Sequence, residues 1–157
     1  MATVYLGIGS NVGDRQAHIQ KAVALLRENE HIQVTAVSSL IETEPVGGVP
    51  QGKFLNGALR IQTDLMPNDL LQALKGIERR CGRVKAQPNG PRSLDLDILL
   101  YDDVVIVEGK TLSIPHPRMA ERAFVLGPLS EIAPDAVHPR LQKTVRELLD
   151  PAPPGDP

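Results

Sequence analysis

The sequence predicts a small α+β protein in which strands and helices follow the order βαββαβ and the strands form an antiparallel sheet. Four segments have the alternating or β-branched composition of strands, and two segments between them repeat apolar residues at helical spacing. Glycine, proline and asparagine separate these segments, as expected for turns. The length of 157 residues and the hydrophobic fraction of 41% suit one compact domain with its own core.

The first strand and the first helix are predicted at the beginning of the chain. Residues 3–9 alternate apolar side chains with small or polar ones, which is typical of a strand buried on one face. The Gly-Ser-Asn-Val-Gly sequence at 9–13 ends this strand, and Asp14 can cap a helix that continues to about Asn29. A second strand follows over Ile32–Leu40, where β-branched residues are frequent.

The second half of the pattern begins with a strand at Phe54–Thr63, after a loop around Pro45–Pro50. Pro67 suits the first position of a second helix, which ends at Gly82. A fourth strand runs from Leu94 to Leu100. The completed order is that of a ferredoxin-like fold, with helices on one main face of an antiparallel sheet.

The C-terminal third is predicted to add a hairpin and short helices. The expected elements are strands at Val104–Val107 and Leu112–Ile114 and helices at residues 121–131 and 141–149. Residues 1–150 are therefore expected to form a single domain. Residues 151–157 are rich in proline and glycine and are expected to fray.

Net charge and cysteine content argue against several classes of protein. The formal net charge of −2 gives no overall attraction to polyanions, so bulk nucleic-acid binding is not expected. The N-terminus lacks a basic region followed by a long apolar run, and no segment reaches membrane-spanning length, so a cytoplasmic protein without membrane contact is expected. Cys81 is the only cysteine, which rules out an internal disulfide and argues against a zinc site.

The segment Gly90-Pro91-Arg92-Ser93-Leu94-Asp95-Leu96-Asp97 carries the strongest indication of chemistry. Residues two apart in a strand point to the same side, so Asp95 and Asp97 would present two carboxylates together, about 7 Å apart along the chain. Neighbouring carboxylates repel each other unless positive charge lies close by, and Mg²⁺ binds one or two carboxylates together with substrate phosphates. The pattern therefore favours a magnesium site, although the solvent face of an amphipathic strand would look the same.

Five cations stand just before this acidic pair, namely Arg79, Arg80, Arg83, Lys85 and Arg92. On a loop rich in glycine and proline, guanidinium groups can close over a polyphosphate and exclude water. Cations are also common at helix ends without any function, which is the simpler explanation for Arg79 and Arg80. Arg83 and Arg92 are the two that we expect to bind phosphate.

Common nucleotide-binding motifs are absent from the sequence. Residues 7–13 nearly match G-x-G-x-x-G, but the last glycine comes one residue late, and no G-x-x-x-x-G-K-[ST] occurs. Farther along, His116 stands between two prolines that hold it in an extended stretch, where an imidazole can contact a phosphate or ribose or satisfy a backbone carbonyl. The nearby Ser113 and Arg122 favour the contact with a nucleotide.

Five motifs, taken in order, resemble those of the hydroxymethyldihydropterin pyrophosphokinase family. They are Gly9-Ser10-Asn11, Phe54-Leu55-Asn56, Gly82-Arg83, the segment from Gly90 to Asp97, and Ile114-Pro115-His116. The resemblance extends over residues 3–149 without large gaps, and Arg-x-x-Asp-x-Asp after Gly-Pro is specific to this family. It implies a Mg²⁺-dependent transfer of the β,γ-pyrophosphoryl group of ATP to the hydroxymethyl group of 6-hydroxymethyl-7,8-dihydropterin, with release of AMP.

The resemblance also implies roles for individual residues. Asp95 and Asp97 would hold two Mg²⁺ ions, and Arg83 and Arg92 would act with them on the phosphates. ATP, the co-substrate, would contact Lys75, Glu78, Arg92, Ile98, Ser113, His116 and Arg122. The pterin would contact Thr43, Pro45, Val46, Phe54, Asn56 and Phe124. A flat pterin needs aromatic faces and an amide at its edge, although either phenylalanine can also be a core residue.

The chain departs from the family pattern in the loop before the acidic pair. Asn89 stands where many members carry a tryptophan, and this loop has fewer basic residues than usual. Lys75 stands where a glutamine is frequent. These differences weaken the expected contacts of the closed loop and of Lys75, but metals and positioning supply most of the catalysis in phosphoryl transfer.

Two other functions are compatible with parts of the pattern. An ATP-binding regulatory module without catalysis would keep the same nucleotide site. A ferredoxin-like nucleic-acid-binding domain would need exposed aromatic residues and a basic sheet face, where this chain has carboxylates. We therefore expect small-molecule substrates as partners, no nucleic acid and no membrane, and a monomer or weak homodimer.

Overall fold

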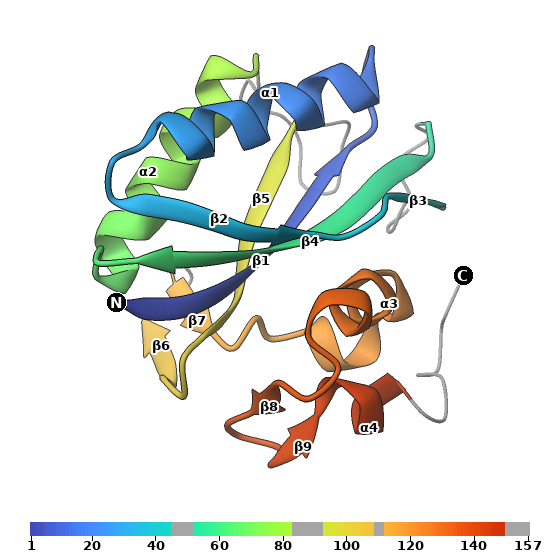
Figure 1. Ribbon diagram of the computed structural model, residues 1–157. Coiled ribbons are helices and arrows are strands. Elements are labelled where there is room, and N and C mark those ends of the chain that lie inside the picture. Colours follow the sequence, from blue (N-terminus) through green and yellow to red (C-terminus); the bar gives the residue numbers. More distant parts are fainter. Residues whose placement is uncertain (45–51, 83–92, 109–111, 150–157) are drawn as a thin grey trace.

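The computed structural model describes residues 1–44, 52–82, 93–108 and 112–149, and Figure 1 shows how their helices and strands are arranged. The elements are β1 (Ala2–Ser10), α1 (Arg15–Glu28), β2 (Ile32–Val37), β3 (Ile41–Thr43), β4 (Phe54–Thr63), α2 (Pro67–Arg80), β5 (Asp95–Tyr101), β6 (Ile106–Glu108), β7 (Leu112–Ile114), a 3₁₀ helix (Met119–Glu121), α3 (Ala123–Ile132), β8 (Val137–His138), β9 (Lys143–Thr144) and α4 (Val145–Leu149). The predicted order of strands and helices is confirmed, and among these elements the sequence pattern misses the short strands β3, β8 and β9 and the 3₁₀ helix. The tail predicted over residues 151–157 lies outside the described residues.

Five strands form one antiparallel sheet in the order β2–β4–β1–β5, and β3 also pairs with β4. The central strand β1 therefore has a partner on each side. Its register places Gly9 between Asn56 of β4 and Asp95 of β5, and it places Gly7 beside Asp97. Because residues opposite each other in paired strands share a face of the sheet, these five residues all lie on one face.

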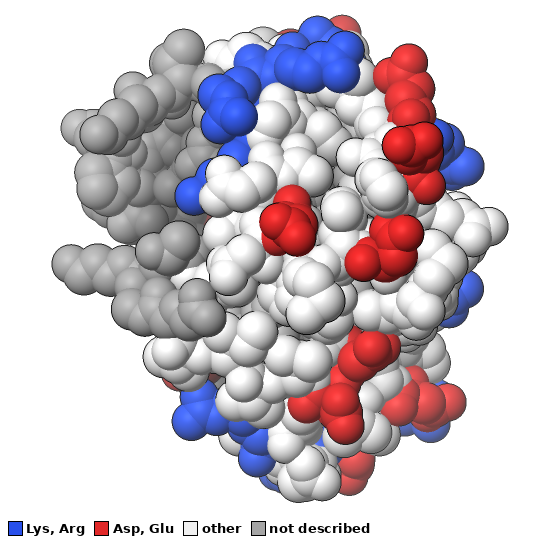
Figure 2. Space-filling view, turned by 90° about the vertical axis from the view of Figure 1, so that its left-hand side faces the viewer, with Lys and Arg blue, Asp and Glu red and all other residues white. Residues whose placement is uncertain are grey.

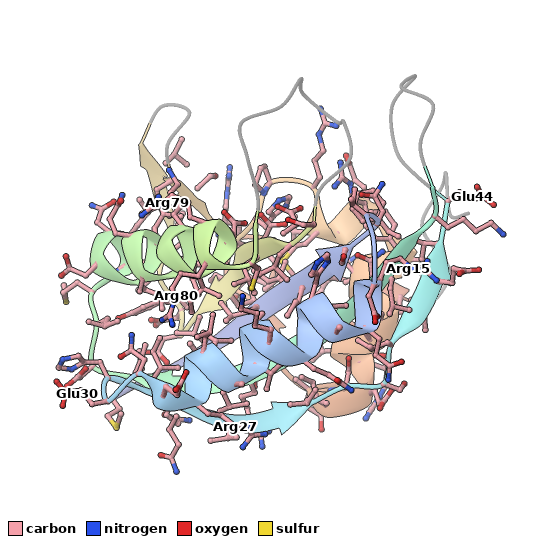
Figure 3. All side chains as sticks on the ribbon, turned by 90° about the horizontal axis from the view of Figure 1, so that it is seen from above. Arg15, Arg27, Glu30, Glu44, Arg79 and Arg80 are labelled. Carbon is pink, nitrogen blue, oxygen red and sulfur yellow. The ribbon has the colours of Figure 1, made fainter. Side chains whose placement is uncertain are left out.

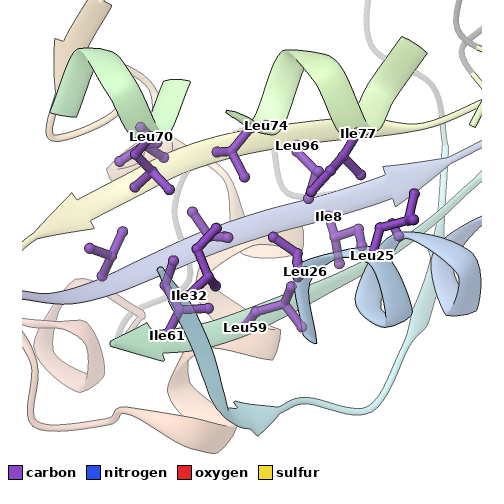
Figure 4. Close-up of a cluster of buried hydrophobic side chains, with 14 of the residues drawn as sticks. Ile8, Leu25, Leu26, Ile32, Leu59, Ile61, Leu70, Leu74, Ile77 and Leu96 are labelled. Carbon is purple, nitrogen blue, oxygen red and sulfur yellow. The ribbon is translucent and has the colours of Figure 1, made fainter. Parts of the chain in front are cut away.

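Helices α1 and α2 cover the other face of the sheet (Figure 1). Asp14 caps α1 as predicted, because its carboxylate accepts a hydrogen bond from the Ala17 N–H at 3.1 Å, and Pro67 begins α2. The main core lies between these helices and the strands β1, β2, β4 and β5, as Figure 4 shows. Its members include Ile8, Leu25, Leu26, Ile32, Leu59, Ile61, Leu70, Leu74, Ile77 and Leu96.

Helix α3 packs against the face of the sheet opposite α1 and α2 (Figure 1). A second apolar cluster forms there, in which Ala58 and Leu99 of the sheet meet Leu126 and Leu129 of α3. Both faces of the sheet therefore carry helices, whereas the sequence pattern placed helices on one main face. The apolar period of a C-terminal helix shows that it is buried, but it does not show against which face.

The second predicted strand is shorter than its β-branched composition suggests. Strand β2 ends at Val37, and the chain passes through Ser38 before β3 begins at Ile41. The buried Ser38 hydroxyl accepts a hydrogen bond from the Ala58 N–H at 2.8 Å, so a side chain in place of a backbone carbonyl satisfies this donor of β4. The same hydroxyl donates a local hydrogen bond to the Ser39 carbonyl at 2.8 Å, at the point where the strand that was predicted to continue to Leu40 is interrupted.

The last helix begins later than predicted. Strands β8 and β9 pair before it, and Gln142 between them has a positive φ of 56°. The Thr144 hydroxyl then accepts a hydrogen bond from the Glu147 N–H at 3.1 Å, and the Glu147 carboxylate accepts one from the Thr144 N–H at 2.9 Å. This capping box makes Val145 the first residue of α4, in place of the predicted Leu141.

The surface carries charges of both signs. Figure 2 shows Asp and Glu side chains interspersed with Lys and Arg on one face of the molecule. In the described part of the chain, no helix combines the length and the apolar character needed to cross a bilayer.

Candidate active site

A pocket lies on the face of the sheet that α3 covers in part. Strands β1, β4 and β5 form its floor, and residues before and within the first turn of α3 form a wall. It is lined by Gly7, Ile8, Gly9, Glu44, Phe54, Asn56, Gly57, Asp95, Asp97, Leu99, His116, Arg122, Phe124 and Val125. The pocket thus brings together seven residues that the sequence analysis assigned to metal, nucleotide or pterin binding: Phe54, Asn56, Asp95, Asp97, His116, Arg122 and Phe124.

Two glycines of β1 form the middle of the pocket floor. Gly9 lies between Asn56 and Asp95 in the strand register. A Cβ atom at position 9 would lie 2.6 Å from Asn56 Oδ1, whereas a Cβ atom at position 7 would lie 3.5 Å from the Leu99 side chain, an ordinary van der Waals distance. The absence of a side chain at Gly9 therefore leaves space into which the Asn56 amide extends.

Asp95 and Asp97 extend from β5 into the pocket, while Leu96 and Ile98 between and beyond them are buried toward the helices. The two aspartates are partly exposed, so they are accessible to a ligand. Within the described residues, no cluster of three or more His, Cys, Asp or Glu side chains could hold a metal ion. A pair of carboxylates in an open pocket fits Mg²⁺, which completes its coordination with substrate phosphates and water.

Arg122 and Phe124 form part of the wall at the start of α3. The Arg122 guanidinium lies over the Phe124 ring, with Cζ 5.5 Å from the ring centroid. Burial is the main cause that lowers the pKa of Arg122 below its ordinary value, Arg118 lowers it further, and Asp97 and Asp95 act in the opposite direction. The Arg122 charge therefore acts in the same region as the two carboxylates, where it can pair with an anionic ligand.

His116 lines the pocket with a neutral imidazole. Its Nδ1 atom accepts a hydrogen bond from the Arg118 N–H at 3.2 Å, which assigns the ring proton to Nε2. Burial is the largest cause that lowers the His116 pKa from 6.5, and the positive charge of Arg122 adds to it, whereas Asp95 opposes it. The ring thus accepts a hydrogen bond from a backbone N–H, whereas one alternative from the sequence was a bond to a backbone carbonyl. The other alternative, a contact with the nucleotide, stays a prediction, which the place of His116 in the pocket allows.

Acidification is expected to destabilise the protein through His116 and the buried His138. Burial is the largest cause that lowers each pKa below 6.5, and each Nδ1 atom already accepts a backbone N–H. As the pH falls, these histidines therefore take up protons in the unfolded chain before they do so in the folded protein. The stabilisation that is present above pH 6.5 is lost between pH 6.5 and the lower pKa values of the folded state. We expect the urea midpoint to decrease from pH 7.5 to pH 5.5.

The variant His138→Gln should reduce this pH dependence, because it removes one of the two titrating groups. His31→Gln is the matched control, since His31 is an exposed histidine outside the pocket. If His31→Gln flattened the pH profile as much as His138→Gln does, buried histidines would not be the cause.

Asn56 and Thr43 form a hydrogen-bonded pair beside the pocket. Thr43 lies opposite Phe54 where β3 pairs with β4, and Asn56 Nδ2 donates to the Thr43 hydroxyl at 2.6 Å. Phe54 and Asn56 share a face of β4, as the alternation predicted, and this face lines the pocket. The hydrogen bond to Thr43 therefore fixes the nitrogen of the Asn56 amide, and the space above Gly9 accommodates its oxygen.

Residues 45–51, which include the predicted pterin residues Pro45 and Val46, lie outside the described residues, but the chain on each side of them is anchored. Arg15 at the start of α1 donates hydrogen bonds to the Lys53 carbonyl at 3.0 Å and to the Glu42 carboxylate at 2.9 Å. Figure 3 shows Arg15 and the pocket residue Glu44 at the same end of the molecule. Arg15 therefore joins the residues before this segment to those after it.

Four residues predicted to contact the nucleotide do not line this pocket. Lys75 is exposed on α2, Ser113 is half-buried on β7, and Ile98 is buried in the main core. Glu78 is buried on α2. The predicted phosphate-binding residues Arg83 and Arg92, and Asn89 between them, lie outside the described residues.

Glu78 supports the acidic pair from the other side of β5. Its carboxylate accepts a hydrogen bond from the Leu96 N–H at 2.8 Å. Strand β5 is at the edge of the sheet, so a backbone N–H that points away from β1 needs an acceptor outside the sheet. Leu96 stands between Asp95 and Asp97, and Glu78 therefore holds the backbone from which both carboxylates extend.

Replacing Glu78 by alanine is expected to destabilise the protein by about 1–3 kcal/mol, because the buried Leu96 N–H loses an acceptor. Turnover should also decrease, because Asp95 and Asp97 are no longer held in place. Urea unfolding and steady-state rates measure the two effects. Glu78→Gln keeps an acceptor oxygen and should recover most of the stability; a Gln variant as unstable as the Ala variant would argue against this role.

Sequence reasoning missed the pocket residues that have small or apolar side chains. Gly7 and Gly9 were interpreted as part of a strand and its turn, although their spacing of two carries a signal. In a strand whose other face is Leu6 and Ile8, glycines at alternate positions leave one face without side chains. Glu44 was also missed, because no pattern marks it.

Comparisons with known proteins give a consistent result. The sequence profile of a family described as 7,8-dihydro-6-hydroxymethylpterin-pyrophosphokinase matches residues 5–134. A 2-amino-4-hydroxy-6-hydroxymethyldihydropteridine pyrophosphokinase of Bacillus subtilis is 49% identical over 128 residues, which cover 82% of this chain and 76% of that protein. The enzyme of the same name from Aquifex aeolicus is 44% identical over 148 residues, which cover 94% of this chain and 91% of that protein.

Some relatives are much longer than this chain. The folic acid synthesis protein fol1 of Schizosaccharomyces pombe is 46% identical over 149 residues, or 95% of this chain, but the match spans 20% of that protein. The crystal structure of Plasmodium falciparum HPPK-DHPS with pterin and p-hydroxybenzoate is similar with a TM-score of 0.76, over 95% of this chain and 42% of that chain. At 18% sequence identity, this likeness shows the fold alone.

Proposed function

The chain belongs to the 7,8-dihydro-6-hydroxymethylpterin-pyrophosphokinase family, and from this membership we propose that it transfers pyrophosphate from ATP to 6-hydroxymethyl-7,8-dihydropterin in folate synthesis. In this reaction the hydroxymethyl oxygen of the pterin attacks the β-phosphorus of ATP. A new P–O bond forms, the bond between the α,β-bridging oxygen and the β-phosphorus breaks, and AMP leaves. The hydroxyl proton is released to solvent or to a base.

One observation carries this proposal: a single pocket places a pair of carboxylates next to two phenylalanines and an asparagine amide. A phosphoryl-transfer site needs the carboxylates, because they can hold metal ions on the phosphates. A flat heterocyclic acceptor needs the aromatic faces and a polar group at its edge. Residues that meet the two requirements line the same pocket.

Asp95 and Asp97 are the residues that would hold Mg²⁺, and two ions are expected from the resemblance. Bound Mg²⁺ would neutralise phosphate charge and lower the pKa of the attacking hydroxyl. Arg122, which lines the same pocket as the two aspartates, would bind a phosphate oxygen by a charge-assisted hydrogen bond. His116, neutral and with Nε2 as its proton-bearing atom, can donate a hydrogen bond to the nucleotide.

Phe54, Asn56 and Phe124 would bind the pterin. Phe54 and Phe124 both line the pocket instead of the main core, which supports a stacking role for their rings. Thr43 would act on the pterin through Asn56, because its hydroxyl accepts a hydrogen bond from Asn56 Nδ2. The proposed contacts of Pro45 and Val46 with the pterin, and of Arg83 and Arg92 with the phosphates, remain those implied by the resemblance.

The remaining nucleotide residues have weaker support. Lys75, Glu78, Ile98 and Ser113 lie outside the pocket described above, so ATP would need to extend past the edge strand β5 to reach them. For Ile98 the backbone is the expected contact, since its side chain is buried. Glu78 already holds Leu96, so we assign it a positioning role in addition to the contact expected from the resemblance.

We also propose that residues 1–150 act as one pyrophosphokinase domain of the ferredoxin-like class, in the cytoplasm, as a monomer or weak homodimer. The strand order β2–β4–β1–β5, with α1 and α2 on one face, supports this class. The additional helix α3 on the opposite face contributes the wall of the pocket.

The test is AMP formation from ATP, Mg²⁺ and 6-hydroxymethyl-7,8-dihydropterin. We expect AMP release that depends on both the pterin and Mg²⁺. Release of ADP would indicate a different kinase, and ATP binding without turnover by the folded protein would indicate a regulatory module. Either result would overturn the proposal.

A further inference from the structure

We infer that Gly9 determines the specificity of the pocket, because the absence of its side chain sets the orientation of the Asn56 amide at the edge of the acceptor ring. This inference rests on the proposed role of Asn56 in pterin binding. Gly9 has no side chain that could bind the ligand itself. It acts as a positioning residue through the space that it leaves.

A side chain at position 9 would approach only one of its neighbours too closely. A Cβ atom there would lie 2.6 Å from Asn56 Oδ1, but 3.6 Å from the Phe54 ring and 3.5 Å from the Leu55 carbonyl oxygen. Real Cβ atoms essentially never approach another atom as closely as 2.6 Å. A methyl group at position 9 would therefore conflict with the Asn56 amide and with little else.

The Asn56 side chain, and not the backbone, is the part that would move. Strand β1 is hydrogen-bonded to β4 on one side and to β5 on the other at this position, so its backbone is fixed. The Asn56 side chain is held by the 2.6 Å hydrogen bond that its Nδ2 donates to the Thr43 hydroxyl. Rotation of the amide away from a methyl group would break this hydrogen bond.

The orientation of the amide matters for the class of ligand. An asparagine side chain presents one acceptor oxygen and one donor nitrogen, which match a heterocycle edge that carries a donor and an acceptor side by side. Turning the amide changes which group meets which atom of the ring. The ligand class is thus a flat heterocycle with a fixed donor–acceptor edge, of which the pterin ring is one example.

The experiment compares Gly9→Ala with the unmodified protein. Binding of 6-hydroxymethylpterin is followed by its fluorescence, with Mg²⁺ and a non-hydrolysable ATP analogue present, and binding of the analogue is measured separately. We expect the Kd for the pterin to increase by roughly tenfold or more, as for a lost hydrogen bond, and the Kd for the analogue to change by less than about twofold. Thermal unfolding checks that the variant is folded.

Asn56→Ala and the double variant Gly9→Ala/Asn56→Ala complete a double-mutant cycle. We expect Gly9→Ala to cause little further increase in the Kd for the pterin when Asn56 is already alanine, because the amide that the methyl group would displace is no longer present. If the two losses simply add, Gly9 does not act through Asn56 and the inference is wrong. If Asn56→Ala binds the pterin normally, the proposed role of Asn56 fails, and the inference fails with it.

Gly7→Ala is the matched comparison on the same strand and the same face. Its methyl group would meet only the Leu99 side chain at an ordinary distance of 3.5 Å or more. We expect it to weaken pterin binding less than Gly9→Ala does. Equal losses from the two variants would mean that any methyl group on the floor obstructs the ligand, which would overturn the role assigned to the amide orientation.

Discussion

Replacing Asp97 by asparagine is expected to lower the rate of AMP release by about 10³-fold or more, equivalent to roughly 4 kcal/mol of transition-state stabilisation. The asparagine keeps the shape of the side chain but removes the negative charge, and a neutral amide is a poor ligand for Mg²⁺. The variant should fold normally, because Asp97 is only partly buried and points into the pocket. Steady-state AMP release and calorimetric titration with MgATP measure the loss.

Asp103→Asn provides the control for this variant. It removes the same charge from an exposed aspartate just beyond the end of β5. Its turnover should stay close to that of the unmodified protein. The metal assignment would be refuted if Asp97→Asn bound MgATP and turned over as well as Asp103→Asn does.

The largest loss of stability is expected for Leu59→Ala. Leu59 is fully buried in strand β4, which lies between β2 and β1, and it belongs to the core shown in Figure 4. Its truncation removes buried apolar contacts and leaves a cavity between the sheet and α1, so the free energy of unfolding should decrease by about 2–5 kcal/mol. Urea unfolding at neutral pH measures this change.

The matched control is Val107→Ala, which truncates an apolar side chain on the hairpin strand β6. Val107 is 66% exposed, so its loss should change the free energy of unfolding by less than about 1 kcal/mol. Similar losses for the two variants would mean that the layer between the sheet and the helices is not the main source of stability.

The sequence predicts the large elements of this fold because their apolar residues repeat with clear periods. The alternation of Val4, Leu6 and Ile8 and the stripe of Leu70, Leu74 and Ile77 are both found in the main core. The short strands β3, β8 and β9 have two or three residues each, too few to show a period. Their positions depend on tertiary contacts, such as the pairing of β3 with the long strand β4.

The sequence predicted those residues of the pocket whose chemistry depends on a charged, polar or aromatic side chain. The alternation along β5 correctly placed Asp95 and Asp97 on one face, and the alternation along β4 did the same for Phe54 and Asn56. The position of Glu78 behind Leu96 was not predicted, because it depends on how α2 packs against the edge of the sheet. Such a contact joins residues on different elements, and a single sequence has no pattern that pairs them.

Strand β1 separates the main core from the pocket, and this position has a consequence for how its sequence can change. Val4, Leu6 and Ile8 pack against the helices, where another apolar side chain of similar volume is usually tolerated. Gly9, on the pocket side, cannot gain even a methyl group without meeting Asn56. Tolerance to substitution should therefore alternate along this one strand. Over many generations, neutral drift would alter the residues that hold the fold together while keeping those that leave room for the ligand.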